Sequence, residues 1–268
     1  MATGDGGAVS VTSAERKPSG STIGVLVVLA AVGLWAAYRH VHPAEAAIYD
    51  WDFAVLWKYR TLLISGLGYT LLFTVMCVVL GLFFGVVSGL GRLSHNPLIA
   101  GPFRAYVEVF RCTPALVQLV WFYYALPVLS GIEMSATVAA TLCLSLYGGA
   151  FYSEIVRGGI ISTDVGQTEA GKALGMTRYQ VLKRVVLPQA FKKMVPPLMS
   201  QSIMQLKNTS LLSVLAVPDL LYQGQVIAHD TYRPLEVYTF IAVAYFAVLL
   251  PVTLWSKRME FGSGPREA

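Results

Sequence analysis

Residues 61–91 read TLLISGLGYTLLFTVMCVVLGLFFGVVSGLG, and this stretch contains no charged side chain. About 20 apolar residues are enough for a helix to cross the hydrocarbon core of a bilayer. A charge-free run of this length therefore predicts a membrane-spanning helix. Gly81, Gly85 and Gly89 recur at every fourth position within it, which favours close packing against the backbone of another helix.

The composition of the whole chain agrees with a lipid environment. Of the 268 residues, 55% are hydrophobic and only 13% are charged, whereas soluble proteins carry about 25% charged residues. The apolar runs predict six spanning helices, and the third of them is expected to begin at Pro97 or Leu98. Besides 61–91, the runs lie at 21–38, 112–132, 134–153, 194–218 and 237–256.

Basic residues collect on one side of these predicted helices. If the N-terminus is cytoplasmic, fourteen of the 20 Lys and Arg residues fall in cytoplasmic segments and four in outer segments. The remaining two, Arg111 and Lys207, fall inside the membrane. Cytoplasmic loops carry an excess of Lys and Arg, so both chain ends are predicted to be cytoplasmic.

The chain is expected to consist of segments with different environments. Residues 1–20 are rich in Gly, Ser, Ala and Thr, which favours disorder. Aromatic and charged residues mix just before the charge-free run, which is typical of a membrane interface. We expect a disordered cytoplasmic tail at 1–20, an extra transmembrane helix at 21–38, a periplasmic interfacial segment at 39–60, the main membrane domain at 61–258 and a cytoplasmic tail at 259–268.

The cytoplasmic loop at 162–188 carries the local signals of two short helices joined by a turn. The spacing of a capping box occurs at Asp164–Gln167 and at Thr177–Gln180. Gly175 stands where a helix-ending glycine with positive φ is expected, and Pro188 ends the second helix or begins the next. From these residues alone, the pair either docks on a partner or lies on the anionic inner leaflet. The apolar face expected to dock consists of Val181, Leu182, Val185 and Val186.

The same loop resembles the signature of binding-protein-dependent ABC importer permeases. That signature is Glu-Ala-Ala, three residues, Gly, nine residues, and Ile-x-Leu-Pro. Gly171 stands in place of the second Ala, and Val185 in place of Ile. In that family the loop fits a cleft on the ATPase subunit and transmits its opening and closing. The resemblance therefore implies a coupling role for Glu169, Ala170, Gly171, Gly175, Leu187 and Pro188.

Four further stretches resemble the branch of this family that imports polar amino acids. The likeness covers about residues 57–258 and implies an all-α integral membrane protein of the type I importer fold. Its core has five helices, to which the helix at 21–38 is an addition. Cys112 departs from the small Gly or Ser that is usual at its position. The stretches are Gly66–Leu71, Tyr106–Gln118, Tyr152–Gln167 and Leu206–Leu211.

The resemblance also implies partners, a location and a class of cargo. The partners are a cytoplasmic ABC ATPase dimer, a second permease chain that is identical or paralogous, and a periplasmic amino-acid-binding protein. All of them would act at the bacterial inner membrane. Overall likeness favours glutamate or aspartate as cargo, and arginine, histidine and glutamine are the alternatives.

Ionisable side chains within the spans are candidates for the substrate pathway, because they are costly in lipid unless they are paired or face a cavity. Glu154 either reads a cationic group of the substrate or pairs with Arg111, Arg157 or Lys207 between helices. Arg111 either pairs with Glu108 on its own helix or points at a substrate carboxylate.

Three further polar residues are weaker candidates for the same pathway. Lys207 and Asn208 either anchor neighbouring helices or form a polar wall of the pathway. Gln118 follows the Thr113-Pro114 dipeptide and is a further pathway candidate.

The sequence argues against several other classes of function. It has no His-Glu-x-x-His metal motif, no Gly-x-Ser-x-Gly nucleophile elbow and no phosphate-binding loop, so we expect no catalytic residue, cofactor or metal. The net charge of +5 does not form a basic stripe with interleaved aromatics, so no nucleic-acid partner is expected. A secondary transporter is disfavoured because residues 61–126 and 134–217 show no evident repeat.

Overall fold

The computed structural model describes residues 30–38 and 49–263, with side chains described as far as Arg258. The chain divides into two units, Met1–Trp51 and Asp52–Ala268. In the first unit, residues 30–38 are helical, as expected for the end of the helix at 21–38. The expected tail at 1–20, the start of that helix and most of the interfacial segment lie outside the described residues.

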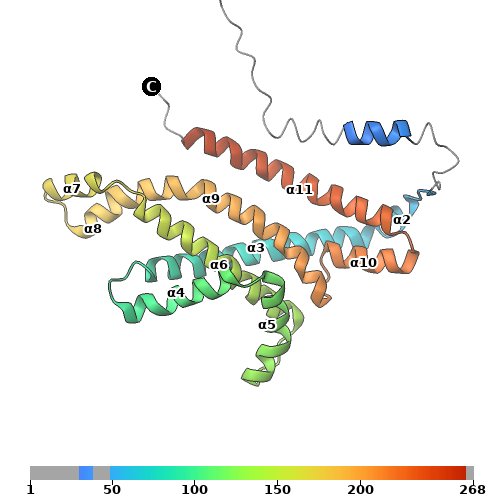
Figure 1. Ribbon diagram of the computed structural model, residues 1–268, viewed down its shortest axis with the longest axis horizontal. Helices are drawn as coiled ribbons and strands as arrows, with labels where there is room; N and C mark the ends of the chain where they lie inside the picture. The colour runs from blue at the N-terminus through green and yellow to red at the C-terminus, as the bar shows by residue number, and fades with distance from the viewer. Residues whose placement is uncertain (1–29, 39–48, 264–268) are drawn as a thin grey trace, which may run out of the picture. The chain divides into compact units, whose positions relative to one another are not determined.

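The second unit is built from helices, and the described residues contain no β-strand, which confirms the all-α prediction (Figure 1). α11 continues to Ser263, inside the segment 259–268 that the sequence predicts to be a tail. The elements are α2 (Ala54–Lys58), α3 (Arg60–Gly91), α4 (Pro97–Cys112), α5 (Ala115–Ser130), α6 (Ala136–Ile161), α7 (Val165–Ala173), α8 (Arg178–Val181), the π-helical turn η1 (Leu182–Val186), α9 (Leu187–Asn208), the 3₁₀ helix η2 (Thr209–Leu215), α10 (Leu220–Thr231) and α11 (Pro234–Ser263).

Within the described residues, three helices are long and apolar enough to cross a membrane, namely α3, α6 and the part of α11 up to Arg258. Two bent pairs also qualify when each pair is taken together. One pair is α4 with α5, and the other joins Arg178–Leu215 to α10. If each bent pair is one span, the second unit has five spans, which is the number expected for the core.

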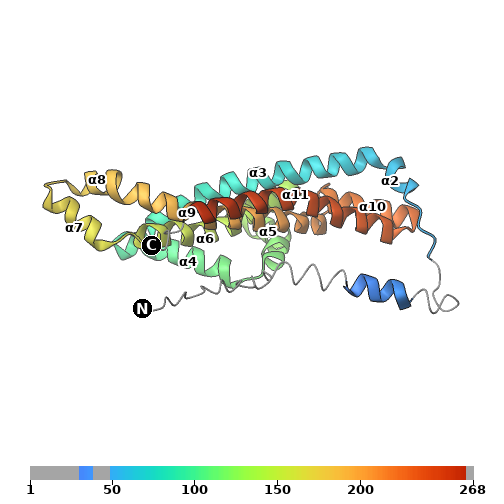
Figure 2. The same ribbon diagram turned by 90° about the horizontal axis from the view of Figure 1, so that it is seen from above.

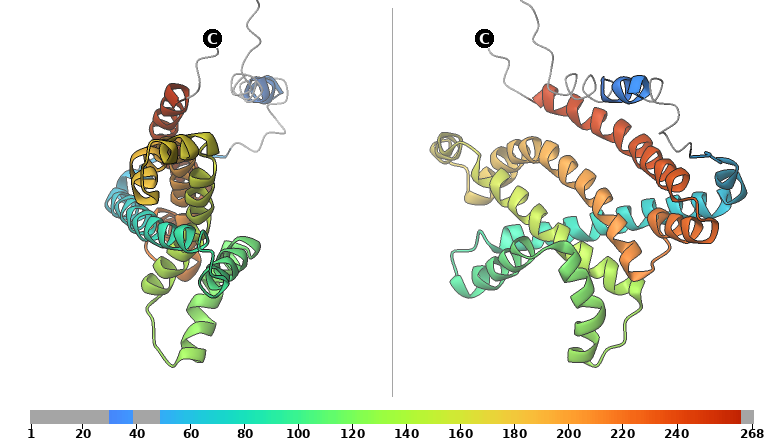
Figure 3. Two further views of the ribbon diagram at one scale, coloured as in Figure 1. Left: turned by 90° about the vertical axis from the view of Figure 1, so that its left-hand side faces the viewer. Right: turned by 45° about the vertical axis from the view of Figure 1, so that its right-hand side comes forward.

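The third predicted helix is broken, and this corrects the expectation of one helix from Pro97 to Ile132. α4 and α5 meet at a bend of 110°, and both views in Figure 3 show α5 turning away from α4. Thr113 has extended backbone angles, with φ −109° and ψ 135°. A residue before proline is driven out of the helical region, and Pro114 has no N–H to donate, so the helix stops there.

The helix predicted at 194–218 has different bounds in the structure. A helical run starts at Arg178, passes through η1, α9 and η2, and ends at Leu215. Ala216 then adopts a left-handed conformation with φ 55°, and the chain bends by 45° into α10, which the sequence did not predict. Pro218 lies in this bend, and the Asp219 side chain caps α10 by accepting from the Tyr222 N–H at 2.8 Å.

α3 and α6 pack together along the predicted glycine stripe. A Cβ on Gly81 would stand 3.2 Å from the Tyr152 ring, and one on Gly89 would stand 3.0 Å from the Ser153 carbonyl oxygen. A Cβ on Gly85 would collide with Tyr152. The stripe therefore lets two backbones approach within one chain, which confirms the packing prediction.

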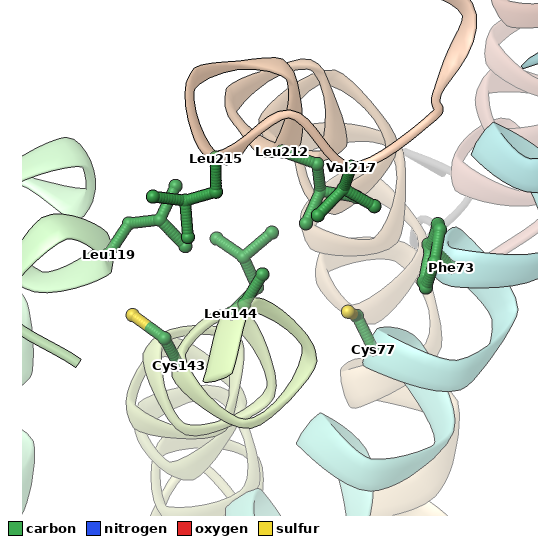
Figure 4. Close-up of a cluster of buried hydrophobic side chains, with 9 residues drawn as sticks. Phe73, Cys77, Leu119, Cys143, Leu144, Leu212, Leu215 and Val217 are labelled. Atoms are coloured by element: carbon green, nitrogen blue, oxygen red, sulfur yellow. The ribbon is translucent and has the colours of Figure 1, made fainter. Parts of the chain in front are cut away.

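A buried apolar cluster joins α3 and α6 to α5 and η2 (Figure 4). Leu144 from α6 lies between side chains from the other three elements, and Leu212 from η2 is fully buried beside it. The apolar runs around all three cysteines predict buried thiols. This is confirmed for Cys77 and Cys143, which belong to this cluster, and is wrong for Cys112, which is exposed. This core holds α5, the second helix of the bent pair, against α3 and α6.

Candidate functional site

Glu154 lies at the centre of a charged cluster that joins three helices. Its Oε1 accepts hydrogen bonds from Arg92 Nη2 at 2.9 Å and from Arg111 Nη1 at 2.7 Å. Its Oε2 lies 3.8 Å from Nη1 of Arg157, one turn further along α6. Of the alternatives left open by the sequence, the structure shows the pairing of Glu154 with Arg111 and Arg157.

Two of the three arginines lie at helix ends, whereas Glu154 and Arg157 lie within α6. Arg92 is the residue directly after α3, and its N–H donates to the Ser88 carbonyl. Arg111 lies in the last turn of α4, just before the break at Thr113. Because Arg111 reaches across to Glu154, it forms no ion pair with Glu108 in the described part of the chain. Arg92 is the member that the sequence analysis did not select.

The cluster combines buried and accessible cations. The Arg92 side chain is only 10% exposed, and its Nε and Nη1 atoms are buried without a hydrogen-bond partner in the described ranges 30–38 and 49–263. The side chains of Arg111 and Arg157 are 41% and 40% exposed. Arg111 also stands over the Phe151 ring, 5.8 Å from its centroid, which adds a cation–π contact with α6. The site thus presents positive charge to any group that reaches it.

Gln118 links the two halves of the broken helix beside this cluster. Its Nε2 donates to the carbonyl oxygens of Phe110 and Thr113, both at 2.9 Å, and its side chain is buried. The carbonyls left free at the end of α4 thereby gain a donor. Gln118 also lines an apolar pocket of about 380 Å³ in the angle between α4 and α5, with Val109, Phe110, Thr113, Val117, Trp121 and Phe122.

Lys207 and Asn208 do not join the Glu154 cluster. Lys207 is exposed and has no ion pair among the described residues, and the buried Nδ2 of Asn208 has no hydrogen-bond partner. The contact between α9 and α6 is made instead by Gln205, which was not among the predicted residues. Gln205 is fully buried, and its Nε2 donates to the Leu144 carbonyl at 2.9 Å, so it holds α9 against α6.

The predicted loop at 162–188 folds into two helices at one end of the second unit (Figures 1 and 2). Both hydrogen bonds of the capping box between Thr177 and Gln180 form, at 2.8 and 3.3 Å. Gly175 has φ +75°, as predicted for a glycine that ends a helix. Asp164 caps α7 by accepting from the Gly166 N–H at 2.7 Å, one position earlier than the box spacing suggests.

The small residue at the third position of the loop signature has a packing reason. Gly171 is buried between α7 and α8, where an added Cβ would stand 3.0 Å from Cγ2 of Val181. The preceding residues Glu169 and Ala170 are exposed and therefore accessible to a partner. The side of α7 that carries Gly171 packs against α8, and the side that carries Glu169 and Ala170 remains exposed.

The exposed apolar surface of the loop differs from the predicted face. Val181 is 2% exposed and Val186 is 9% exposed, because both pack inward. Leu182 is exposed as expected. The most exposed apolar side chains of the loop are instead Leu174 at 82%, Val165 at 68% and Tyr179 at 67%.

The loop is joined to the bundle by a π-helical turn and a lysine. In η1 the Leu187 N–H donates to the Leu182 carbonyl, five residues back, and the next residue, Pro188, has no N–H to offer. Pro188 therefore lies in the first turn of α9, which Leu187 begins, within a helical run that continues from α8. Lys193 Nζ donates to the Ser162 carbonyl at 2.6 Å, which ties α9 to the start of the loop.

Comparisons with known proteins agree with this arrangement. Residues 78–261 match the family described as binding-protein-dependent transport system inner membrane component. The chain is 34% identical to the glutamine transport system permease protein GlnP of Escherichia coli K12 over 212 residues, which are 79% of this chain and 97% of that protein. It is 36% identical to the glutamate/aspartate import permease protein GltK of Escherichia coli O6:H1 over 214 residues, covering 77% and 96%.

Solved structures support the same assignment. The chain resembles a crystal structure of an amino acid ABC transporter with histidines, with a TM-score of 0.75, 35% identity, and coverage of 79% of this chain and 99% of that one. It shares its fold with the MetNI methionine ABC transporter in an inward-facing conformation, with a TM-score of 0.63 and 21% identity. The family match spans more than half of the chain and includes the loop at 162–188. The chain therefore belongs to the family of binding-protein-dependent transport system inner membrane components.

Proposed function

We propose that this chain is the membrane-spanning permease subunit of an ATP-driven importer for polar amino acids. The observation that carries the proposal is the likeness, over more than three quarters of the chain, to permeases for glutamine and for glutamate and aspartate. That likeness includes both the Glu154 cluster and the loop at 162–188. The protein would act in the bacterial inner membrane, with both termini in the cytoplasm.

The transport step proposed for this subunit is alternating access driven from the loop. A loaded periplasmic binding protein docks outside, and ATP closes a cytoplasmic ATPase dimer against α7 and α8. The exposed Glu169 and Ala170, with the apolar side chains of Leu174 and Tyr179, offer that dimer a mixed surface. The Lys193–Ser162 bond then transmits the movement of the loop to α6 and α9. A second permease chain, identical or paralogous, completes the pathway.

Within the polar amino acids, we infer that the cargo is glutamate or aspartate. The support is the positive charge of the cluster, in which three guanidinium groups face one carboxylate. Glutamine is the alternative, because a relative of similar identity is a glutamine permease. Arginine carries a side-chain cation that the cluster would repel, and so does the protonated form of histidine, which makes both weaker candidates.

Uptake measurements test this function directly. Cells that lack the subunit should lose uptake of one labelled polar amino acid, and restoring the chain should bring that uptake back. The assay compares glutamate, aspartate, glutamine, arginine and histidine at equal concentration. Unchanged uptake of all five would refute the amino-acid proposal, and uptake that persists without ATP would favour a secondary transporter.

The coupling role of the loop needs its own comparison of variants. Gly175→Ala places a side chain at φ +75°, whereas Gly158→Ala adds one to α6 where the backbone is helical. Neither added Cβ has a neighbour within 4 Å among the described residues, so neither is crowded; Gly175→Ala strains the backbone, and Gly158→Ala does not. Gly175→Ala and Glu169→Gln should each lower ATPase association and uptake, while Gly158→Ala should leave both unchanged. If both loop variants associate and transport normally, the coupling proposal is wrong.

A further inference from the structure

The charged cluster has more donors than its own carboxylate can use. Three arginines and one glutamate leave a net charge of +2 in a half-buried site. A guanidinium carries five N–H donors, and the cluster uses one nitrogen of each arginine toward Glu154. Nε and Nη1 of Arg92 are buried and have no hydrogen-bond partner among the residues that the structure describes. The exposed N–H groups of Arg111 and Arg157 that Glu154 does not use make the site suited to a second acceptor, and the unpaired donors of Arg92 add to its positive potential.

We propose that Arg92, Arg111 and Arg157 form a binding site for the α-carboxylate of the transported amino acid, and that Glu154 occupies this site as an internal carboxylate between transport cycles. This inference rests on the proposed function and names the group of the cargo that the cluster recognises. A guanidinium group can donate two parallel hydrogen bonds to one carboxylate, so a carboxylate binds such a site with favourable geometry.

The two exposed arginines and the buried one have different roles in the proposed binding site. Arg111 and Arg157 are about two-fifths exposed, so their remaining N–H groups can meet a carboxylate from solution. Arg92 holds Glu154 from the buried side and keeps the local potential positive. Phe151 supports the Arg111 guanidinium from one side and limits its orientation.

Glu154 also explains how such a site would release what it binds. A cargo carboxylate that reaches Arg111 must compete with a carboxylate that is already 2.7 Å from the same nitrogen. Because the competitor is tethered, it returns at once when the cargo moves on, and the cargo is not trapped. Three arginines without Glu154 would hold an anion tightly, which would favour binding over transport.

The experiment measures binding of labelled glutamate, glutamine and arginine to the purified permease–ATPase complex without the binding protein. Glu154→Gln keeps the shape of the side chain and removes its charge. It should raise the affinity for the cargo about tenfold, the effect of one charge-assisted hydrogen bond, while uptake slows. The gain should vanish in the double variant Glu154→Gln with Arg111→Gln, and for a cargo analogue whose α-carboxylate is an amide.

Thermal unfolding of the same complex provides a second measurement. Glu154→Gln should unfold at a lower temperature, because three cations lose their counter-charge, and cargo should restore the melting temperature while the amide analogue should not. Glu154→Asp keeps the charge and serves if the Gln variant does not fold; its shorter side chain should give a smaller gain in affinity. Equal cargo affinity in the wild type and both variants would overturn the proposal.

Three further outcomes distinguish failure of the proposed function, failure of the carboxylate site and binding of a lipid phosphate. If the wild-type importer moves none of the tested amino acids, the proposed function itself fails. If it transports normally but Glu154→Gln binds no more cargo, only the carboxylate site is wrong. If melting temperature is restored by vesicles of phosphatidylglycerol and not by cargo in phosphatidylcholine, the anion is a lipid phosphate and the assignment to cargo is overturned.

Discussion

Replacing Gly85 by alanine should separate the two central helices of the bundle. The added Cβ would collide with Cβ of Tyr152 and would stand 3.1 Å from the Tyr152 carbonyl carbon and 3.2 Å from the Gly149 carbonyl oxygen. Two of these neighbours are backbone atoms, so no side-chain rotation relieves the contact. α3 and α6 must move apart, and Tyr152, which is fully buried, loses its packing.

The magnitude of this effect follows from a matched substitution on the same helix. Gly68→Ala adds the same methyl group where nothing lies within 4 Å. Both variants gain up to about 1 kcal/mol from the better helix propensity of alanine. The free energies of unfolding should therefore differ by the cost of overpacking alone, about 1–3 kcal/mol, with Gly85→Ala the less stable variant.

The assay is reversible unfolding of the purified protein in mixed detergent–SDS micelles, followed by tryptophan fluorescence. The difference between Gly85→Ala and Gly68→Ala is the quantity of interest, because it cancels effects of the micelle. Equal free energies of unfolding for the two variants would show that α3 and α6 are not held in the close contact described above.

Three further substitutions test other parts of the fold. Thr177→Ala removes the cap on the Gln180 N–H and should weaken α8 by about 1 kcal/mol, seen as faster hydrogen exchange at 178–181 with unchanged global melting; protection equal to the wild type would contradict this. Lys193→Met should cost less than about 1.5 kcal/mol of stability but lower the uptake per ATP hydrolysed, and an unchanged ratio would remove this bond from the coupling path. Asp219→Asn keeps the cap on α10 and removes a fully buried charge whose Oδ2 has no hydrogen-bond partner in the described part of the chain. The free energy of unfolding should therefore stay equal or rise, and a loss above about 2 kcal/mol would show that the charge is needed.

Features that depend on neighbouring residues could be predicted from the sequence. The capping box at Thr177 and Gln180, the positive φ of Gly175 and the packing of the glycine stripe were all correctly predicted. The first two are decided within a turn or two of helix, where side chains and backbone are already in reach of one another. The spacing of the glycines predicts that another helix packs against α3, but it does not show that this helix is α6. Of the six spans predicted from the apolar runs, the five of the core are matched in the described residues if each bent pair is counted as one span.

Features that depend on distant pairing could not be predicted. Arg92 and Glu154 are 62 positions apart, and nothing near Arg92 distinguishes it from an ordinary cation at the end of a helix. The break at Thr113 could be anticipated from Pro114, but its angle of 110° depends on how α5 packs on α6 and η2. Val181 and Val186 looked like a docking face because the sequence does not show that Gly171 leaves room for Val181 to pack inward.

The π-helical turn η1 fixes the rotational phase between the loop and the rest of the molecule. A π turn contains one residue more than the α-helical register allows, and one residue corresponds to about 100° of rotation about the axis. Deleting a single residue between Leu182 and Val186 would therefore rotate α8 relative to α9 by about 100°, a little more than a quarter of a revolution. A loop exchanged between related proteins would keep its orientation only when both carry this extra residue.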